Sequence, residues 1–243
     1  SAQVYEDIKH AKDFGIEASG KADFGAVIKR SRGVADKMSK GVQFLMKKNK
    51  IDVIMGFGKL KGSGKLEVKD AEGKTQTVEA KHIIVATGGR SRELPSLKQD
   101  GKKVIGYREA MALPQQPKSM IVVGSGAIGV EFGYFYNSMG TKVTIVEFLD
   151  RVVPVEDEEI SKELAKNFKK NGIEIMTSSE VTSIDTGGNG VKAKVKSKDG
   201  EVTLEADVLL SAVGVAANIE GIGLEETGVK TDKGRIAVDK YYQ

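Results

Sequence analysis

The sequence predicts an α/β protein in which a parallel sheet carries an inserted antiparallel meander, beside an incomplete second α/β unit. Three observations predict this fold class. A short apolar strand (121–123) leads into a glycine-rich turn, a helical stretch and a β-branched strand (142–146). Another helix and further short strands follow, and a buried-looking strand (207–213) closes the unit. This order is βαβαβ with a meander inserted, over about 120 residues.

Helical periodicity dominates the beginning of the chain. Residues 1–14 predict a short helix, and Asp23 is expected to cap a longer helix that ends near Asn49. Apolar residues recur along the longer helix at 3.6-residue spacing, which predicts a single face packed in the core. These residues are Phe24, Val27, Ile28, Val34, Ala35, Met38, Val42, Leu45 and Met46.

The period of the apolar residues then changes to two, or to continuous apolar runs. Before the glycine turn, the candidate strands are 52–55, 65–68, 75–79 and 82–86, with a hairpin turn at 70–73. After strand 142–146, we expect a helix at 157–171 and strands at 173–176, 181–185, 191–197 and 201–205. Segments 82–88 and 207–214 resemble each other, since each is an apolar run that stops at glycine. This echo suggests two related nucleotide-binding domains.

The turn Gly124–Gly129, with the sequence GSGAIG, has the glycines that dinucleotide binding requires. Gly124 permits a tight turn, Gly126 lets the backbone approach a pyrophosphate, and Gly129 lets the helix pack closely on the strand. The N-terminus of the helix supplies free N–H groups and a partial positive charge. Strand, turn, helix, second strand and terminal acid are all present, so the pattern is far more specific than G-x-G-x-x-G alone.

The terminal acid, Glu147, indicates which dinucleotide binds. It ends the second strand about twenty residues after the turn, where a carboxylate accepts both ribose hydroxyls. A carboxylate would repel the additional phosphate of NADP, and residues 148–150 offer no cation. Arg151 is the nearest base, and a longer loop would be needed to aim it at the ribose. The sequence therefore favours NAD.

Composition excludes several other kinds of protein. The 38 basic residues are interleaved with 34 acidic ones, so no basic block indicates nucleic acid. No apolar run approaches the ~20 residues of a membrane span, no signal peptide opens the chain, and the cytoplasm is the expected location. Without cysteine, the chain forms no disulfide or thiolate zinc site, and we expect no metal. His10 and His82 lack evident acid–base partners, so a cofactor would carry any catalysis.

Segments spread over nearly the whole chain match segments of one known family, and they occur in the same order as in that family. They include GVQFLMKKNKIDVIMGFGKL, HIIVATGG, GSGAIGVEFG, VTIVEFLDRVVP, DVLLSAVG and GLEETGV. On these segments the sequence resembles the pyridine-nucleotide–disulfide oxidoreductases, and most closely their lipoamide branch, the dihydrolipoamide dehydrogenases. Glu147 followed by FLDRVVP favours that branch. Ser91 and Ala217 replace prolines that the family usually has, so we expect looser loops there.

The resemblance implies a domain order. Residues 1–115 would be part of an FAD-binding domain of Rossmann-like fold, residues 116–233 a Rossmann-like NAD-binding domain, and residues 234–243 the start of the return to the FAD domain. The family's redox-active cysteine pair, flavin glycine fingerprint, flavin-side lysine and dimerisation domain with its His–Glu pair would lie outside these residues. FAD is therefore expected only when those segments are present, and the isolated chain is expected to be inactive.

The resemblance also implies site residues. The implied FAD contacts are Gly58, Thr87, Gly88 and Gly89. The implied NAD contacts are Gly124, Ser125, Gly126, Ala127, Ile128, Gly129, Val130, Glu131, Glu147, Val181 and Gly214. Glu131 corresponds to a carboxylate that, in relatives, pairs with the lysine beside the flavin ring, which implies a supporting catalytic role. Its alternative interpretation is an ordinary exposed helix acid.

The implied function is a flavin-dependent dihydrolipoamide:NAD oxidoreductase. The implied partners are small-molecule dinucleotides, a second copy in a homodimer, and lipoyl domains of 2-oxo acid dehydrogenase complexes or the glycine cleavage system, without nucleic acid or membrane. Alternatives are a mercuric or glutathione reductase type, or a non-enzymatic NAD-binding fragment. Tyr5 and Lys9 form the Tyr-x-x-x-Lys pair of single-cofactor dehydrogenases, but they precede the glycine turn. The segment GKLKGSGK lacks phosphate-loop spacing and is followed by Leu66 rather than Ser or Thr.

Overall fold

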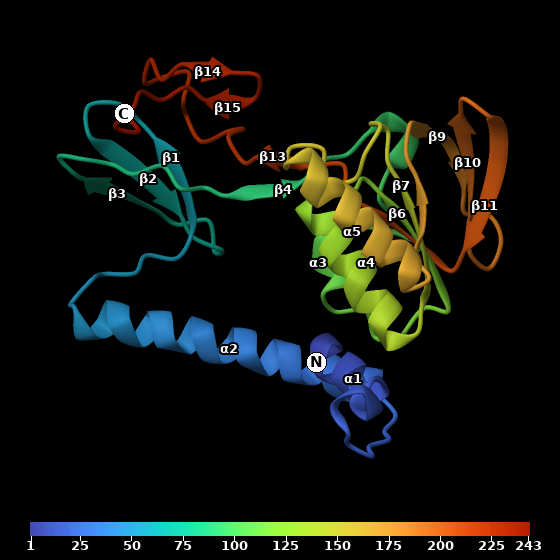
Figure 1. Cartoon of the computed structure of the whole chain (residues 1–243). Coiled ribbons are helices and arrows are strands. Elements are labelled where there is room, and N and C mark those ends of the chain that lie inside the picture. The colour runs from blue at the N-terminus through green and yellow to red at the C-terminus, as the bar shows by residue number, and fades with distance from the viewer. The chain divides into compact units, whose positions relative to one another are not determined.

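The structure is a computed structural model that describes residues 1–243 (Figure 1). The chain forms two compact units. The first unit comprises residues 1–35 and 91–214, and the second comprises residues 36–90 and 215–243. The expected boundary at 115/116 therefore lies within the first unit, and the assignment of the domains to FAD and NAD stays a prediction.

A five-stranded parallel sheet forms the centre of the first unit. Its strands, in spatial order, are β5 (Val104–Ile105), β12 (Val208–Ser211), β6 (Ser119–Val123), β7 (Lys142–Val146) and β8 (Glu174–Met176). All neighbouring pairs are parallel. The chain adds β7 and β8 on one side of β6 and later returns to place β12 on the other side. The direction of winding therefore reverses between β6 and β12, which is where open α/β sheets bind ligands.

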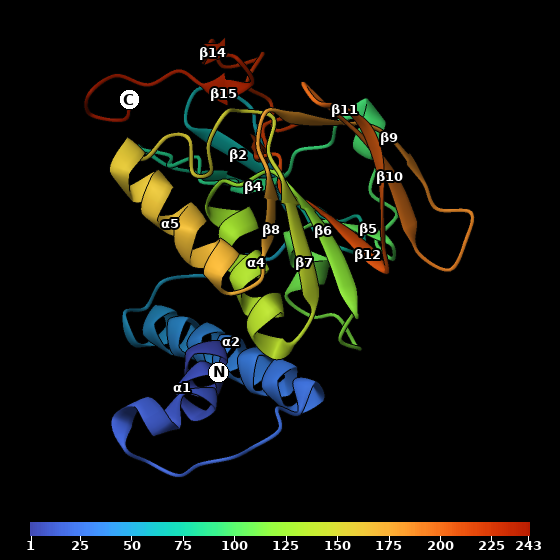
Figure 2. The same ribbon diagram turned by 45° about the vertical axis from the view of Figure 1, so that its right-hand side comes forward.

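The two faces of this sheet pack against different layers (Figure 2). Met120 and Val122 of β6 face the helical layer, which includes α4 (Ala127–Met139) and α5 (Glu158–Lys170). Ile121 and Val123 face the opposite layer, because successive side chains of a strand alternate between faces. That layer is the antiparallel meander of β9 (Ser179–Asp185), β10 (Val191–Ser197) and β11 (Gly200–Ala206). The expected parallel sheet with its meander is confirmed.

The helices at the start of the chain confirm part of the prediction. Residues 1–14 form α1 (Ala2–Lys9) and a separate 3₁₀ turn, η1 (Ala11–Phe14), rather than one helix. Helix α2 (Phe24–Lys48) begins where expected, since the Ala26 N–H donates to Asp23 Oδ1 over 3.0 Å. The other short helical segments are η2 (Pro95–Leu97) and α3 (Tyr107–Ala110).

The prediction that one whole face of α2 is buried is wrong beyond its first two turns. Phe24 is buried in the core of the first unit, where Val27 and Ile28 pack against it. Met38 and Val42 are 69% and 54% exposed. Helical spacing predicts an apolar face but does not ensure a partner, and these residues belong to none of the three hydrophobic clusters.

The second unit contains mainly short antiparallel sheets. Strands β1 (Phe57–Leu60), β2 (Lys65–Lys69) and β3 (Thr75–Glu79) form a three-stranded sheet, as expected for 65–68 and 75–79. The remaining pairs are β4 (Gly89–Ser91) with β13 (Val215–Ala217), and β14 (Thr231–Asp232) with β15 (Arg235–Ile236). A small core of Leu60, Ile222 and Leu224 joins the two chain segments of this unit, and Leu60 N–H donates to Ile222 O over 2.8 Å.

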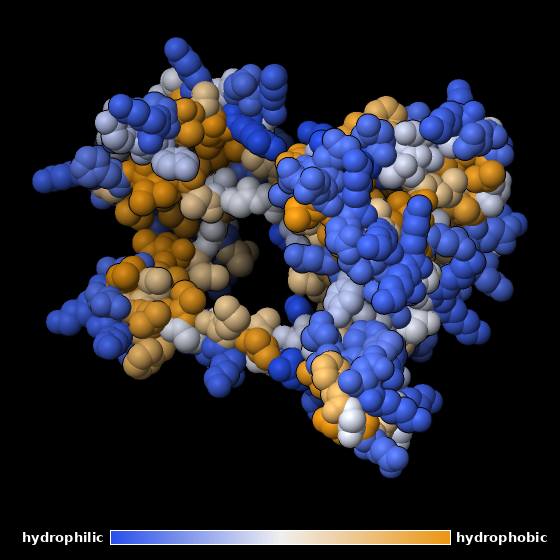
Figure 3. Space-filling model, in the orientation of Figure 1, coloured by the Kyte–Doolittle hydropathy of each residue, from blue (hydrophilic) through white to orange (hydrophobic).

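Two expected strands of the second unit, 52–55 and 82–86, are absent. Both stretches lie outside regular structure, and Met55 and Ile84 are 80% and 91% exposed. The prediction of strands at these two apolar runs is wrong, because a strand needs a neighbour to pair its backbone groups and neither run has one. Figure 3 shows hydrophobic surface gathered on this unit, on the strands β1–β3 and on the C-terminal half of α2.

Candidate dinucleotide-binding site

The glycine turn has the steric requirements that the sequence predicts. Gly124 has φ +97°, and a Cβ there would lie 2.5 Å from the carbonyl oxygen of Ala212. A Cβ on Gly129 would overlap the carbonyl oxygen of Gly124, so the helix packs closely against the turn only because this residue is glycine. A Cβ on Gly126 would meet no atom within 4 Å. The turn is therefore closely packed at its ends and open in its middle.

The open middle of the turn coincides with the start of helix α4. Gly126 is the residue before the helix, and no side chain caps the helix N-terminus. The first N–H groups of an α-helix have no carbonyl partner within the helix. Together with the helix dipole, these N–H groups form a place that suits an anionic pyrophosphate.

The carboxylate of Glu147 is tied to this turn by hydrogen bonds. Its Oε2 accepts from both the N–H and the Oγ–H of Ser125, each over 2.7 Å. Its Oε1 accepts from the N–H of Leu149 over 2.8 Å. Glu147 is 7% exposed and Ser125 is fully buried. Because Gly124 N–H also donates to Val146 O, the end of β7 and the turn after β6 form one connected element.

The end of strand β12 lies beside the same turn. Ala212 N–H donates to Val123 O over 2.8 Å, which holds the carboxyl ends of β12 and β6 together. Gly214 follows with φ +110°, and a Cβ there would meet no atom within 4 Å. The structure therefore brings Gly214, Glu147 and the glycine turn together at the point where the sheet changes winding direction.

The remaining candidate NAD residues differ in how far they are exposed to solvent. Ala127 and Glu131 are exposed, and Ile128 and Val130 are half-buried. Val181 lies in β9, and its side chain is buried in the cluster that contains Val123 and Val146, beneath the turn. Glu131 lies in the second turn of α4, and its side chain forms neither a hydrogen bond nor an ion pair. The binding roles of these residues stay predictions.

Arg151 forms no ion pair with Glu147. Its Nη2 donates instead to the carbonyl oxygen of Pro154 over 3.1 Å. The partners of the Glu147 carboxylate are instead Ser125 and Leu149. The acid therefore meets no cation, in agreement with the preference for NAD that the sequence indicates.

The candidate FAD residues lie in the second unit. Gly58 is in β1 and pairs with Val68 of β2. Thr87 and Gly88 are held by Asn218, whose Nδ2 donates to Thr87 O over 3.1 Å and whose N–H donates to Gly88 O over 3.0 Å. Gly88 has φ +72° and open space at its Cβ position. No local motif indicates this function of Asn218, which follows Ala217, one of the two residues that replace family prolines.

An exposed ion pair supports the same segment. Arg90 donates to Ala217 O and to Asn218 Oδ1, each over 3.0 Å, and its Nη2 lies 2.7 Å from Glu220 Oε1. The hydrogen bond from Arg90 lowers the pKa of Glu220 to about 2. No local motif distinguishes this pair, because its members are 130 residues apart.

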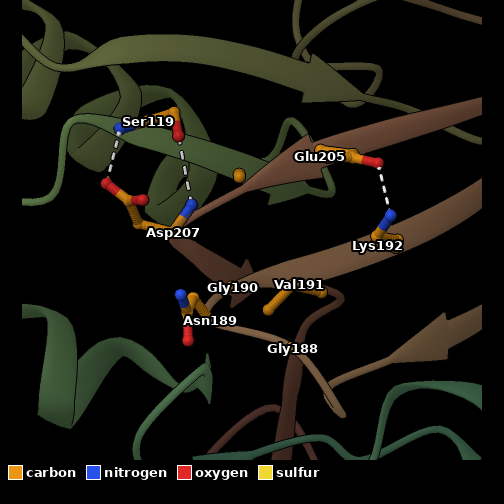
Figure 4. A pocket seen from close by; sticks show the side chains of 9 residues that line it. Ser119, Gly188, Asn189, Gly190, Val191, Lys192, Glu205 and Asp207 are labelled. Atoms are coloured by element: carbon orange, nitrogen blue, oxygen red, sulfur yellow. Dashed lines mark hydrogen bonds and ion pairs between the residues drawn. The ribbon is translucent and has the colours of Figure 1, made fainter.

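A separate cavity of about 350 Å³ lies near the opposite end of β6 (Figure 4). Its polar groups pair mainly with one another: Lys192 Nζ lies 2.8 Å from Glu205 Oε1, and Asp207 N–H donates to Ser119 Oγ over 3.1 Å. None of the candidate site residues lines it.

No cluster of His, Asp and Glu side chains in residues 1–243 could hold a metal ion. No helix has the length and apolar character that a membrane span requires.

The fold and the turn together define the class of the protein as α/β with a dinucleotide-binding unit of Rossmann-like type. The model of one family, described as pyridine nucleotide-disulphide oxidoreductase, matches residues 2–243. The chain therefore belongs to the pyridine nucleotide-disulphide oxidoreductase family.

Curated proteins named dihydrolipoyl dehydrogenase are similar to this chain. The one from Rhizobium etli is 46% identical over 99% of this chain and 54% of its own length. The one from Zymomonas mobilis is 44% identical over 99% of this chain and 52% of its own length. The chain thus spans about half the length of the curated relatives that it matches.

Solved structures agree with the fold. LpdA from Mycobacterium tuberculosis has a TM-score of 0.86 and 29% identity, covering 96% of this chain and 51% of that one. The HOCl-induced flavoprotein disulfide reductase RclA of Escherichia coli, as the Cu(II) complex of a mutant form, has a TM-score of 0.79 and 26% identity. That match covers 90% of this chain and 49% of the other.

Proposed function

We propose that this chain supplies the NAD-binding part, and some of the FAD-binding part, of a dihydrolipoamide:NAD oxidoreductase. The observation that carries the proposal is the geometry at the switch point of the sheet. There, an open glycine turn, an uncapped helix N-terminus and a buried carboxylate meet. Relatives of 40–46% identity that are named dihydrolipoyl dehydrogenase support the particular activity.

The residues of the first unit fit NAD. The empty space at the Cβ position of Gly126 gives a pyrophosphate room against the N-terminus of α4. Glu147 would accept a hydroxyl of the adenosine ribose, and no cation is bonded to it that would attract a 2′-phosphate. When bound, the nicotinamide and the flavin supply the hydride chemistry, and this chain contributes binding and orientation.

The residues of the second unit fit part of a flavin site. Asn218 holds the backbone of Thr87 and Gly88, so that a positive-φ glycine is open to solvent. The side chains of Ile83 and Ile84, which precede Thr87 and Gly88 in the chain, are 38% and 91% exposed. Exposed apolar residues next to a fixed backbone turn favour a further layer of protein and cofactor at this place. FAD would therefore bind when additional segments of the protein are present.

The proposed partners follow from the activity. A dihydrolipoamide oxidoreductase would act on lipoyl domains of 2-oxo acid dehydrogenase complexes or of the glycine cleavage system, as a homodimer in the cytoplasm. A second candidate function is another flavoprotein disulfide reductase, favoured by the structural likeness to RclA. The two candidates differ in their disulfide substrate.

The first experiment is a visible absorption spectrum of the purified 243-residue chain, before and after anaerobic addition of NADH, combined with an NADH binding titration. We expect a colourless protein that binds NADH weakly and has no diaphorase activity. Failure to bind NADH would contradict the proposed NAD site. Diaphorase turnover without added flavin protein would contradict the proposed dependence on FAD.

A further inference from the structure

A carboxylate at the end of β7 is expected to accept both ribose hydroxyls, but most hydrogen-bond acceptor positions of Glu147 are already occupied by the protein. An ionised carboxylate has about four lone-pair positions, two on each oxygen. Oε2 accepts two hydrogen bonds from Ser125, at 2.7 Å each. Oε1 accepts one hydrogen bond from the N–H of Leu149, at 2.8 Å. One acceptor position therefore remains, and it is on Oε1.

Without the hydroxyl of Ser125, the Glu147 carboxylate would have two free acceptor positions instead of one. Any residue except proline could donate its backbone N–H to Oε2 from this position. The hydroxyl is an additional donor, and it is fully buried, so solvent does not compete with Glu147 for it. Because a carboxylate only accepts, the hydroxyl must be the donor.

We propose that Ser125 is a positioning residue that restricts Glu147 to one hydroxyl of the adenosine ribose. This inference rests on the proposed NAD site. Ser125 acts through Glu147 by occupying the second acceptor position of Oε2. The acid would then bind a single hydroxyl through Oε1, rather than both hydroxyls through its two oxygens.

The experiment measures dissociation constants of the 243-residue chain for NADH and for two NADH analogues, which lack the 2′- or the 3′-hydroxyl of the adenosine ribose. In the wild type, we expect one analogue to bind about tenfold more weakly than NADH, because a hydrogen bond to a charged group is lost. The other analogue should bind within about twofold of NADH, because Glu147 has no position for the missing hydroxyl.

In Ser125→Ala, a position on Oε2 becomes free, so both analogues should bind more weakly than NADH by similar factors. Ser138→Ala is the matched control, since Ser138 is also buried but lies at the opposite end of α4. It should keep the unequal response of the wild type.

Equal responses of the wild type to the two analogues would overturn the proposal, and this comparison stands even if Ser125→Ala does not fold. A merely structural role of Ser125 would weaken all three ligands by one common factor in Ser125→Ala, leaving the wild-type ratios unchanged, and that result would overturn it as well. Absence of NADH binding by the wild type would contradict the NAD site itself. NADH binding with equal analogue responses would contradict only the function of Ser125.

Discussion

The glycines of the turn are required for three different physical reasons. Gly124 needs a positive φ and lies against the backbone of Ala212, directly after the end of β12. Gly129 needs the absence of a Cβ, because the carbonyl oxygen of Gly124 fills that space. Gly126 has free space at its Cβ position, so the packing of the protein does not require glycine there, and in the proposed NAD site the ligand would require it. One motif therefore combines two residues that the packing of the turn requires with one that leaves room for the proposed ligand.

Gly129→Ala is expected to destabilise the protein by about 1–3 kcal/mol, because the added methyl group overlaps backbone that cannot move freely. NADH binding should weaken in parallel, since the turn must shift. Urea unfolding followed by circular dichroism and an NADH titration measure the two effects.

Gly41→Ala is the control for Gly129→Ala, because Gly41 is also within a helix but its Cβ position is open. This change should stabilise the protein by about 0.5–1 kcal/mol through the better helix propensity of alanine. Equal effects of the two substitutions would contradict the steric explanation.

At the scale of elements, the sequence predicts those whose signals are local. The turn at 70–73 forms because Asp70 Oδ1 accepts from the N–H groups of Glu72 and Lys74. Helix α2 begins at a side-chain cap that the sequence displays directly. By contrast, the strands expected at 52–55 and 82–86 are absent, because no other segment pairs with their backbone groups.

Asp23→Ala tests the cap of helix α2. Loss of the hydrogen bond to the Ala26 N–H should lower the free energy of unfolding by about 1 kcal/mol. Asp36→Ala is the matched control, because Asp36 is an exposed aspartate in the interior of the same helix. It should be neutral or slightly stabilising, since alanine is the better helix former. Urea unfolding of both variants checks this, and equal losses would show that the cap is not responsible.

At the scale of the whole molecule, the two similar segments 82–88 and 207–214 differ in structure, since only the second contains a strand of a sheet. Leu210 lies in β12 between two paired strands and is fully buried. Ile84 has a similar place in its apolar run, but it is 91% exposed. Their local sequences are alike, and the presence of neighbouring strands accounts for the difference.

Leu210→Ala should lower the free energy of unfolding by about 2–5 kcal/mol, because it leaves a cavity in the core. Ile84→Ala should change it by less than about 0.5 kcal/mol, since an exposed side chain loses little burial. Circular dichroism in urea compares the two variants. A large loss for Ile84→Ala would mean that this segment packs within the 243-residue chain after all.

The sequence by itself determined the fold class, the glycine turn, its acid and most helices and strands, because these depend on periodicity and on contacts within about twenty residues. Only the tertiary structure decided how the acid is used and which apolar faces are covered. Ser125 donates both its N–H and its hydroxyl to Glu147 because β6 and β7 are neighbours in the sheet. Arg90 pairs with Glu220 because β4 and β13 are neighbours. Hydrogen bonds and burial depend on distances in space, and local sequence patterns do not specify those distances.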